Sequence, residues 1–166
     1  MPDRAPRWSL WLVVSAVVVA ADLATKAWVS RVFAPGEVLE VTSFFNLVLT
    51  HNTGAAFSFL AGAGGWQRWF FTAIAVAISA AIVVLLPRQR DPWMAAALAL
   101  VLGGALGNLY DRLTLGRVVD FVQLHAGGYY WPAFNVADSA ITVGVLLLVW
   151  DSLRGRRVQT TQGERS

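Results

Sequence analysis

Four long apolar windows constrain the fold of this chain more than any other feature of its sequence. They run from Trp8 to Val29, from Trp69 to Leu86, from Trp93 to Tyr110 and from Phe134 to Trp150. A helix needs about 20 predominantly apolar residues to cross the hydrocarbon core of a bilayer. The sequence therefore predicts a membrane all-α fold with four transmembrane helices.

The composition and the tryptophans support this prediction. Only 14% of the residues are charged, whereas soluble domains carry about a quarter. Tryptophan rings favour the membrane interface. All eight tryptophans fall at or beside the ends of the windows: Trp8, Trp11, Trp28, Trp66, Trp69, Trp93, Trp131 and Trp150.

Several functional classes are excluded by residue content. The chain has no cysteine, so it has no disulfide framework, thiolate metal site or cysteine nucleophile. His51 and His125 lack metal-ligand spacing, and neither a metal nor a cofactor is expected. The net charge of +3 comes from short basic flanks without interleaved stacking aromatics. Nucleic acid is therefore not an expected partner.

The arginines predict the orientation in the membrane. Four spans place both termini and the connection 87–92 on one side, which carries eight arginines against four on the other. By the positive-inside rule both termini are cytoplasmic. In an alternative interpretation the first window is a cleaved signal peptide, because Arg4 and Arg7 precede its apolar run. The charged residues after this apolar run can contribute to a function only if the window is retained in the mature protein, which argues against cleavage.

The two outer connections are expected to be structured. Val38–Val41, Phe44–Thr50 and Arg117–Leu124 are rich in β-branched and aromatic residues. These segments predict a small extracytoplasmic β-element resting on the membrane.

Two further segments complete the predicted organisation. An interfacial segment is expected beside the β-element, from the apolar side chains of Phe57, Phe59, Leu60 and Trp66. Residues 1–155 are expected to form a single four-helix domain, and residues 156–166 a disordered cytoplasmic tail.

Polar residues gather at one depth of this topology. Ionisable groups in membrane segments are costly and tend to mark functional sites. Topology brings eight polar residues close to the outer interface: Asp22, Lys26, Asn52, Asn108, Arg112, Asp120, Asn135 and Asp138. The inner halves of the windows hold almost nothing comparable, so we expect a site near the outer face.

Each of these residues also has a structural interpretation. Asp22 and Lys26 lie four residues apart and can neutralise each other. Asn135 followed by Asp138 resembles a helix N-cap with a carboxylate in the first turn. The others are a loop tether for Arg112, an ordinary turn for 52–54, an exposed strand end for Asp120, and close helix packing for Gly103 and Gly107. Their convergence at one depth favours a functional site.

Five motifs carry a family resemblance. They are Asp22-Leu-Ala-Thr-Lys26, Asn52-Thr-Gly-Ala-Ala-Phe57, Gly103-Gly-Ala-Leu-Gly-Asn-Leu-Tyr-Asp-Arg112, Gly116-Arg-Val-Val-Asp-Phe121 and Phe134-Asn-Val-Ala-Asp138. In this order, over four spans, they resemble the lipoprotein signal peptidase family, also called signal peptidase II. The likeness covers residues 8–150.

The resemblance implies an aspartic endopeptidase with Asp120 and Asp138 as its catalytic pair. Residues implied to bind substrate or support the site are Asp22, Lys26, Asn52, Gly54, Gly104, Asn108, Arg112, Asn135 and Ala137. It further implies a multi-pass protein of the bacterial cytoplasmic (inner) membrane, with membrane lipid as a partner and inhibition by globomycin. We expect it to be a monomer.

The implied substrate is a diacylglyceryl-modified prolipoprotein, cleaved on the N-terminal side of the lipidated cysteine. Two close carboxylates in a poorly hydrated site share one proton near neutrality, so one can act as base and the other as acid. The pair titrates as a unit, and the two roles stay unassigned.

Two other functions remain open at this point. A small proton- or ion-coupled membrane transporter also needs intramembrane Asp, Lys and Asn residues, but its relay would require polar groups that reach both faces. A scaffold protein would need the small-residue packing of Gly103 and Gly107 and no acidic residues.

Overall fold

The computed structural model of the chain describes residues 8–54 and 65–163. Its helices are α1 (Trp8–Val32), α2 (Trp66–Leu85), α3 (Pro92–Thr114) and α4 (Val136–Gly163), and the short 3₁₀ helix η2 (Leu86–Arg88) follows α2. Each of the four α-helices contains a stretch that is long and apolar enough to cross a membrane. The prediction of a four-span, mainly helical membrane fold is confirmed.

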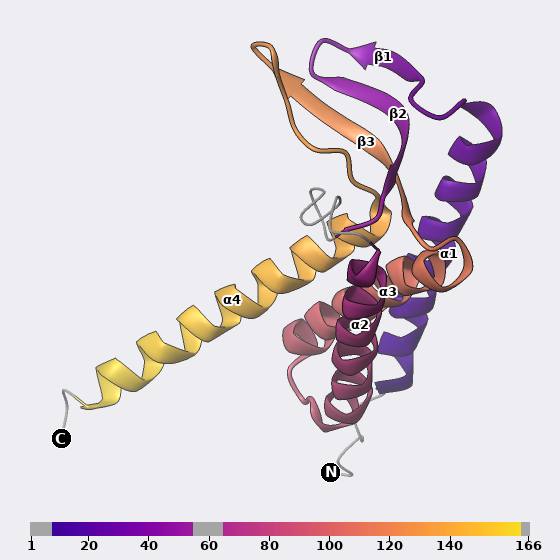
Figure 1. Ribbon diagram of the computed structural model, residues 1–166. Helices are drawn as coiled ribbons and strands as arrows, with labels where there is room; N and C mark the ends of the chain where they lie inside the picture. Colours follow the sequence, from indigo (N-terminus) through magenta and orange to yellow (C-terminus); the bar gives the residue numbers. More distant parts are fainter. Residues whose placement is uncertain (1–7, 55–64, 164–166) are drawn as a thin grey trace.

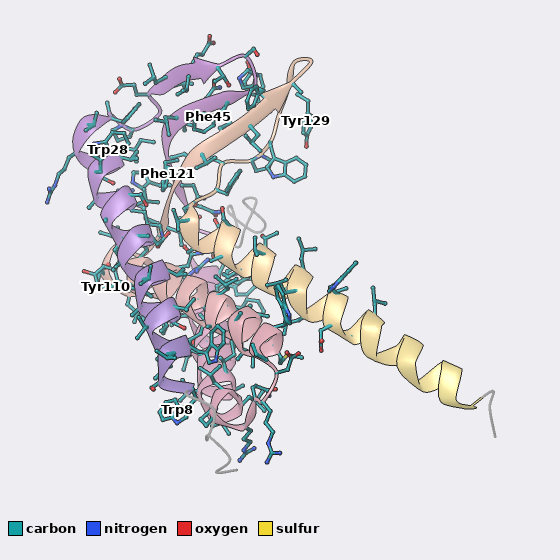
Figure 2. The ribbon with its side chains drawn as sticks, turned by 180° about the vertical axis from the view of Figure 1, so that it is seen from behind. Trp8, Trp28, Phe45, Tyr110, Phe121 and Tyr129 are labelled. Carbon is teal, nitrogen blue, oxygen red and sulfur yellow. The ribbon has the colours of Figure 1, made fainter. Side chains whose placement is uncertain are left out.

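The two long connections form one antiparallel sheet with the strand order β1-β2-β3-β4. Its strands are β1 (Val38–Thr42), β2 (Phe45–Asn52), β3 (Val118–Ala126) and β4 (Tyr129–Tyr130). The first three follow the predicted segments closely, whereas β4 was not predicted. The sheet lies at one end of the helices, and Trp8, the first residue of α1, lies at the other (Figures 1 and 2).

The expected interfacial segment and the expected tail are only partly described. Trp66 is the first residue of α2 and does not belong to a separate interfacial segment. Phe57, Phe59 and Leu60 lie outside the described residues. The backbone of α4 is helical to Gly163, so the helix includes most of the segment 156–166 that was expected to be disordered. The domain division at residue 155 stays a prediction.

Helix α3 is the central element of the helical region. It packs against α1, α2 and α4, and it is the most deeply buried of the four candidate spans. Gly103 lies against α1, where a Cβ atom would be 2.7 Å from the Cβ of Val18. Gly104 lies against the carbonyl of Ala137 in α4. Glycine at these positions allows both neighbouring helices to approach closely. At Gly107, the other member of the predicted pair with Gly103, a Cβ atom would lie 2.6 Å from Oδ2 of Asp22 in α1, which agrees with the predicted small-residue packing.

A buried apolar cluster fixes the sheet to the helices. It consists of Val29 in the last turns of α1, Phe33 directly after that helix, Leu49 of β2, and Val119 and Phe121 of β3. Beside the sheet, these side chains join the first half of the chain to the second. The strand that carries Asp120 is therefore held at the end of α1 by hydrophobic burial.

Candidate active site

The eight polar residues that topology predicted at one depth lie together between the sheet and the adjoining ends of α1, α3 and α4. Seven are buried: Asp22, Lys26, Asn52, Asn108, Arg112, Asp120 and Asn135. Asp138 is half-buried. Buried polar side chains need hydrogen-bond partners, and here they mostly find them in one another.

The first turn of α4 positions Asp138. The backbone N–H of Asp138 donates to Oδ1 of Asn135 at 2.9 Å, and the N–H of Asn135 lies 3.4 Å from Oδ2 of Asp138. This reciprocal arrangement is a capping box. The structural interpretation of Asn135 as an N-cap is therefore correct, and the cap fixes the position of the Asp138 carboxyl group.

The segment before α4 brings Asn135 beside Asp120. Phe134 pairs with Val122 of β3, its backbone N–H donating to the Val122 carbonyl at 2.9 Å. Nδ2 of Asn135 then donates to Oδ1 of Asp120 at 2.7 Å and lies 3.2 Å from the carbonyl oxygen of Val119. One asparagine thus contacts both acidic residues, through its side-chain amide nitrogen on Asp120 and its side-chain oxygen on Asp138.

Asp120 itself is a buried residue of β3, opposite Thr50 of β2. Only 1% of it is exposed, so its interpretation as an exposed strand end was wrong. Burial, followed by the negative charge of Asp138, raises the pKa of Asp120 to about 7, against the opposing effect of hydrogen bonds from Asn52 and Asn135. Asp120 can therefore gain or lose a proton near neutral pH.

Asn108 of α3 holds the other carboxyl group. Its Nδ2 donates to Oδ1 of Asp138 at 2.8 Å. Its Oδ1 accepts from Nζ of Lys26 at 3.0 Å and from Nδ2 of Asn135 at 3.2 Å. Asn108 and Asn135 together form a continuous hydrogen-bonded link between the two aspartates.

Lys26 is paired with two carboxylates. Its Nζ lies 2.7 Å from Oδ2 of Asp22, the predicted ion pair, and 3.0 Å from Oδ2 of Asp111. Asp111 was not among the predicted site residues, and it is only 3% exposed. A signal was available: Asp111 lies three residues after Asn108, so both share one face of α3, and it is an ionisable residue in a largely apolar helix.

Arg112 ties the chain after β2 to α3. Its Nη2 donates to the carbonyl of Gly54 at 2.8 Å, and its guanidinium carbon lies 5.5 Å from the centroid of the Phe71 ring. The backbone N–H of Gly54 donates to Oδ1 of Asn52 at 2.8 Å, which forms an Asx turn. The turn and tether interpretations of these residues are both correct.

Gly104 and Ala137 hold α4 in place through packing and backbone contacts. The Ala137 carbonyl leaves no room for a side chain at Gly104. The backbone N–H of Ala137 donates to Oδ1 of Asp22 at 2.9 Å. Both residues therefore fix the position of α4, and with it the position of Asp138.

Asp138 borders two cavities. One, of about 160 Å³, lies between α2, α3 and α4, and its lining includes Phe71, Ile74, Asn108, Arg112 and Ile141. The other, of about 340 Å³, lies between β3 and the first turns of α4, and its lining includes Leu124, Trp131, Phe134, Thr142 and Val143. Asp138 therefore has a cavity on each of two sides of α4.

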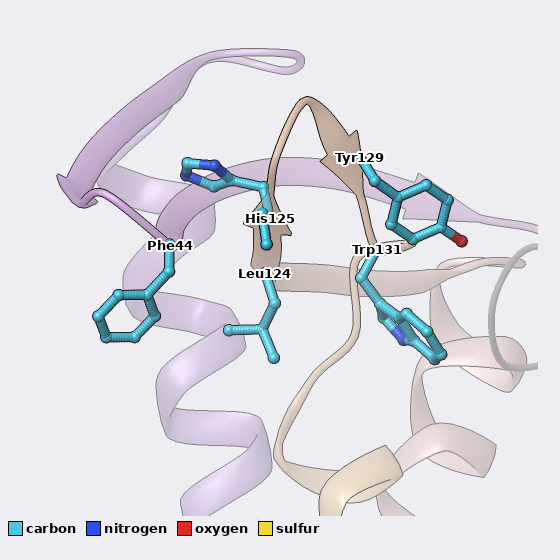
Figure 3. A pocket seen from close by; sticks show the side chains of 6 residues that line it. Phe44, Leu124, His125, Tyr129 and Trp131 are labelled. Carbon is cyan, nitrogen blue, oxygen red and sulfur yellow. The ribbon is translucent and has the colours of Figure 1, made fainter.

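A third cavity, of about 300 Å³, lies along the β3–β4 hairpin and shares Leu124 and Trp131 with the second. Figure 3 shows Leu124 and Trp131 pointing to the side of the hairpin on which the helices lie. The remaining lining residues are Phe44, His125, Ala126 and Tyr129. An almost wholly apolar surface thus continues from Asp138 to the tip of the hairpin.

Neither histidine belongs to the polar site. His125 pairs with Oδ1 of Asn46 at 3.1 Å and stacks on Tyr130. Burial and the nearby Arg117 lower the pKa of His51, which favours its neutral form at neutral pH. Among residues 8–54 and 65–163, no group of three His, Cys, Asp or Glu side chains is arranged to hold a metal ion.

Comparisons with known proteins agree on one family. The family model described as signal peptidase (SPase) II matches residues 14–154. A protein named lipoprotein signal peptidase from Paraburkholderia phytofirmans is 58% identical over 145 residues, which are 87% of this chain and 84% of the relative. One of the same name from an Azoarcus species is 52% identical over 154 residues, 92% of this chain and 88% of the relative.

The fold comparison gives the same result. A solved structure described as a bacterial membrane enzyme is 34% identical, with a TM-score of 0.79 over 88% of each chain. A second one with the same description is also 34% identical, with a TM-score of 0.76 over 87% of this chain and 93% of the other. This multi-pass membrane protein belongs to the signal peptidase II family of proteases.

Proposed function

We propose that this protein is an aspartic endopeptidase that removes signal peptides from diacylglyceryl-modified prolipoproteins. Asp120 and Asp138 are the catalytic pair, and the cleaved bond lies on the N-terminal side of the lipidated cysteine. Neither a metal nor another cofactor takes part. The observation that carries the proposal is the link between the two carboxyl groups through Asn108 and Asn135.

The chemistry follows from a single proton shared by the pair. The pKa of Asp120 is raised to about 7, by burial and by the charge of Asp138, which supports a state with one carboxylate and one carboxylic acid at neutral pH. The carboxylate takes a proton from water as the water attacks the peptide carbonyl. The carboxylic acid hydrogen-bonds the carbonyl oxygen and then helps the leaving amine to depart.

The geometry of a lipoprotein precursor suits this site. A signal peptide crosses the bilayer and ends near its outer face, and the arginine distribution supports cytoplasmic termini and a site near the outer face of the inner membrane. Helical backbone must unwind before cleavage, and the cavity between β3 and α4 offers a place beside Asp138 for an extended segment. The apolar surface that continues to the hairpin suits membrane lipid or acyl chains.

Supporting residues keep this geometry in place. Asn52 and Asn135 hydrogen-bond Asp120, and Asn108 hydrogen-bonds Asp138. Arg112 holds the turn at Gly54. Asp22, Lys26, Gly104 and Ala137 fix α4 against α1 and α3.

One cleavage assay tests the proposal. Purified protein is incubated with lipid-modified and with unmodified prolipoprotein, and release of the signal peptide is measured. We expect cleavage of the modified precursor by the parent chain and none by Asp120→Asn or Asp138→Asn. Asp91→Asn is the matched control, because Asp91 only caps α3 at the opposite end and Asn caps a helix equally well.

The outcomes separate the alternatives. Failure to cleave either precursor, or full activity in both Asp→Asn variants of the pair, would overturn the proposal. Proton or ion flux across vesicles that requires Asp120, without cleavage, would instead indicate the transporter. Size determination in detergent tests the expected monomer.

A further inference from the structure

We propose that Asp111 is a positioning residue for the dyad: together with Asp22 and Lys26 it sets the separation between Asp120 and Asp138. This inference rests on the proposed aspartic peptidase function. We call Asp22, Lys26 and Asp111 the Lys26 cluster. All three residues are at most 3% exposed.

Asp111 anchors the strand that carries Asp120. Its Oδ2 accepts a hydrogen bond from the backbone N–H of Val119 at 3.1 Å. Val119 immediately precedes Asp120 in the chain. Because a backbone position fixes where the next side chain starts, the carboxylate of Asp111 ties Asp120 to helix α3.

Asp22 anchors α4 by the same arrangement. Its Oδ1 accepts from the backbone N–H of Ala137 at 2.9 Å. Ala137 immediately precedes Asp138. The carboxylate of Asp22 thus ties Asp138 to helix α1, just as Asp111 ties Asp120 to α3.

Lys26 joins the two anchors. Its Nζ lies 2.7 Å from Oδ2 of Asp22 and 3.0 Å from Oδ2 of Asp111, and it donates to Oδ1 of Asn108 at 3.0 Å. An ammonium group has three N–H donors, and three oxygen atoms lie within 3.0 Å of this nitrogen. One buried cation therefore links the backbones before both aspartates, and it also orients the Asn108 amide toward Asp138.

This arrangement makes the distance between the two carboxyl groups a property of helices α1 and α3. The segment 131–135, which joins β4 to α4, does not have to define this distance alone. The charged groups that act on Asp120 or face it are Asp138 of α4, Lys26 of α1 and Arg112 of α3. A change at Asp111 alters the position of Asp120 relative to all of them.

Two substitutions of Asp111 separate position from charge. The same atom, Oδ2, accepts from Val119 and contacts Lys26, so the amide oxygen of Asp111→Asn can take its place without the charge. Asp111→Ala removes the acceptor. We expect Asp111→Ala to lower kcat by about 100-fold, as for a displacement of reacting groups by about 1 Å, with KM little changed. Asp111→Asn should lower kcat clearly less than Asp111→Ala does.

The pH profile gives a readout that a purely structural role would not change. The charge of Asp138 contributes to the high pKa of Asp120, so a wider separation weakens their coupling. In Asp111→Ala the two apparent pKa values of the bell-shaped kcat profile should move closer together. In Asp111→Asn their spacing should remain that of the parent chain.

Ser15→Ala is the matched control for lost stability. It removes a buried hydrogen bond of 2.8 Å to the Ala99 carbonyl, far from both aspartates in the chain, and kcat per folded molecule should be unchanged. If Asp111→Ala does not fold, the comparison is made with Asp111→Asn and Lys26→Met, which keep the side-chain volume.

Two results would overturn this inference while the parent chain still cleaves its substrate. One is a parent-like kcat per folded molecule in Asp111→Ala, or in Lys26→Met if the alanine variant does not fold. The other is a low kcat with a pH profile of unchanged width. Failure of the parent chain itself to cleave would instead remove the proposed function.

Discussion

The two aspartates of the site lie in contrasting surroundings. Asp120 is in the interior of a strand, is 1% exposed and accepts hydrogen bonds from asparagines. Asp138 is in the first turn of a helix, is half-buried and borders two cavities. One carboxyl group is thus enclosed by the protein, whereas the other faces two cavities.

The contrast shows how one fold prepares two identical side chains differently. The strand supplies burial, which raises the pKa of Asp120. The helix N-terminus supplies backbone N–H donors and a favourable dipole for the carboxylate of Asp138. Substitutions that change the surroundings of only one aspartate test whether this contrast affects activity and stability.

The largest expected effect comes from removing either carboxyl group. Asp120→Asn and Asp138→Asn should each lower kcat/KM by about 10⁴-fold, the upper range for loss of general acid–base catalysis. The double variant should be no worse than either single one, because the pair acts as a unit. Additive losses would contradict a shared role, and Asp91→Asn provides the control.

The second effect is on stability and follows from the burial of Asp120. The pKa of Asp120 rises from 3.8 to about 7 in the folded protein, so the folded state holds a proton that the unfolded state releases. Stability from this group is therefore fully present below about pH 4 and is lost as pH rises toward 7. At about 1.4 kcal/mol for each pKa unit, Asp120→Asn should stabilise the fold by up to about 4 kcal/mol at pH 8.

Thermal unfolding in detergent at pH 4 and pH 8 measures this effect. The gain in Tm for Asp120→Asn should be large at pH 8 and nearly absent at pH 4. An equal gain at both values would show that burial of the charge is not its cause.

A third, smaller effect is a loss of activity on substitution of Asn135, which contacts both Asp120 and Asp138. Asn135→Ala removes the N-cap of α4, which accepts from the backbone N–H of Asp138, and it removes the hydrogen bond to Asp120. We expect about a 100-fold loss of kcat, together with about 1 kcal/mol of stability from the lost cap. Asn135→Asp is informative beside it, because aspartate caps a helix but cannot donate to Asp120.

The smallest expected effect concerns the packing of α4. A methyl group in Gly104→Ala would meet the Ala137 carbonyl and lie 2.7 Å from Cγ1 of Ile141. Overpacking of this kind costs about 1–3 kcal/mol, and the shift of α4 should lower activity through Asp138 while leaving Asp120 in place. Cleavage rate and Tm measure the two effects. Leu106→Ala is the control, because Leu106 lies on the exposed side of α3, and parent-like activity in Gly104→Ala would contradict the expectation.

Much of this architecture could be predicted from the sequence. The spans follow from apolar length, and the common depth of the polar residues follows from the alternation of the helices. The Asp22–Lys26 pair and the Asn135 cap follow from spacing within one helix. These features depend on local sequence, and local rules describe them well.

The remainder depends on contacts between distant parts of the chain. Asp120 looked like an exposed strand end because nothing local shows that Asn135 would cover it. Asp111 was overlooked because its partners, Lys26 and Val119, come from other elements. The two-residue strand β4 offers too short a pattern to predict.

The burial of the Lys26 side chain has a practical consequence, since it is the only lysine among the 166 residues. Amine-directed acylation needs an accessible amine, and only 3% of Lys26 is exposed in the folded protein. Modification of Lys26 should therefore report transient local opening of the protein. The rate at which a single mass increment appears at that residue would measure the frequency of this local opening.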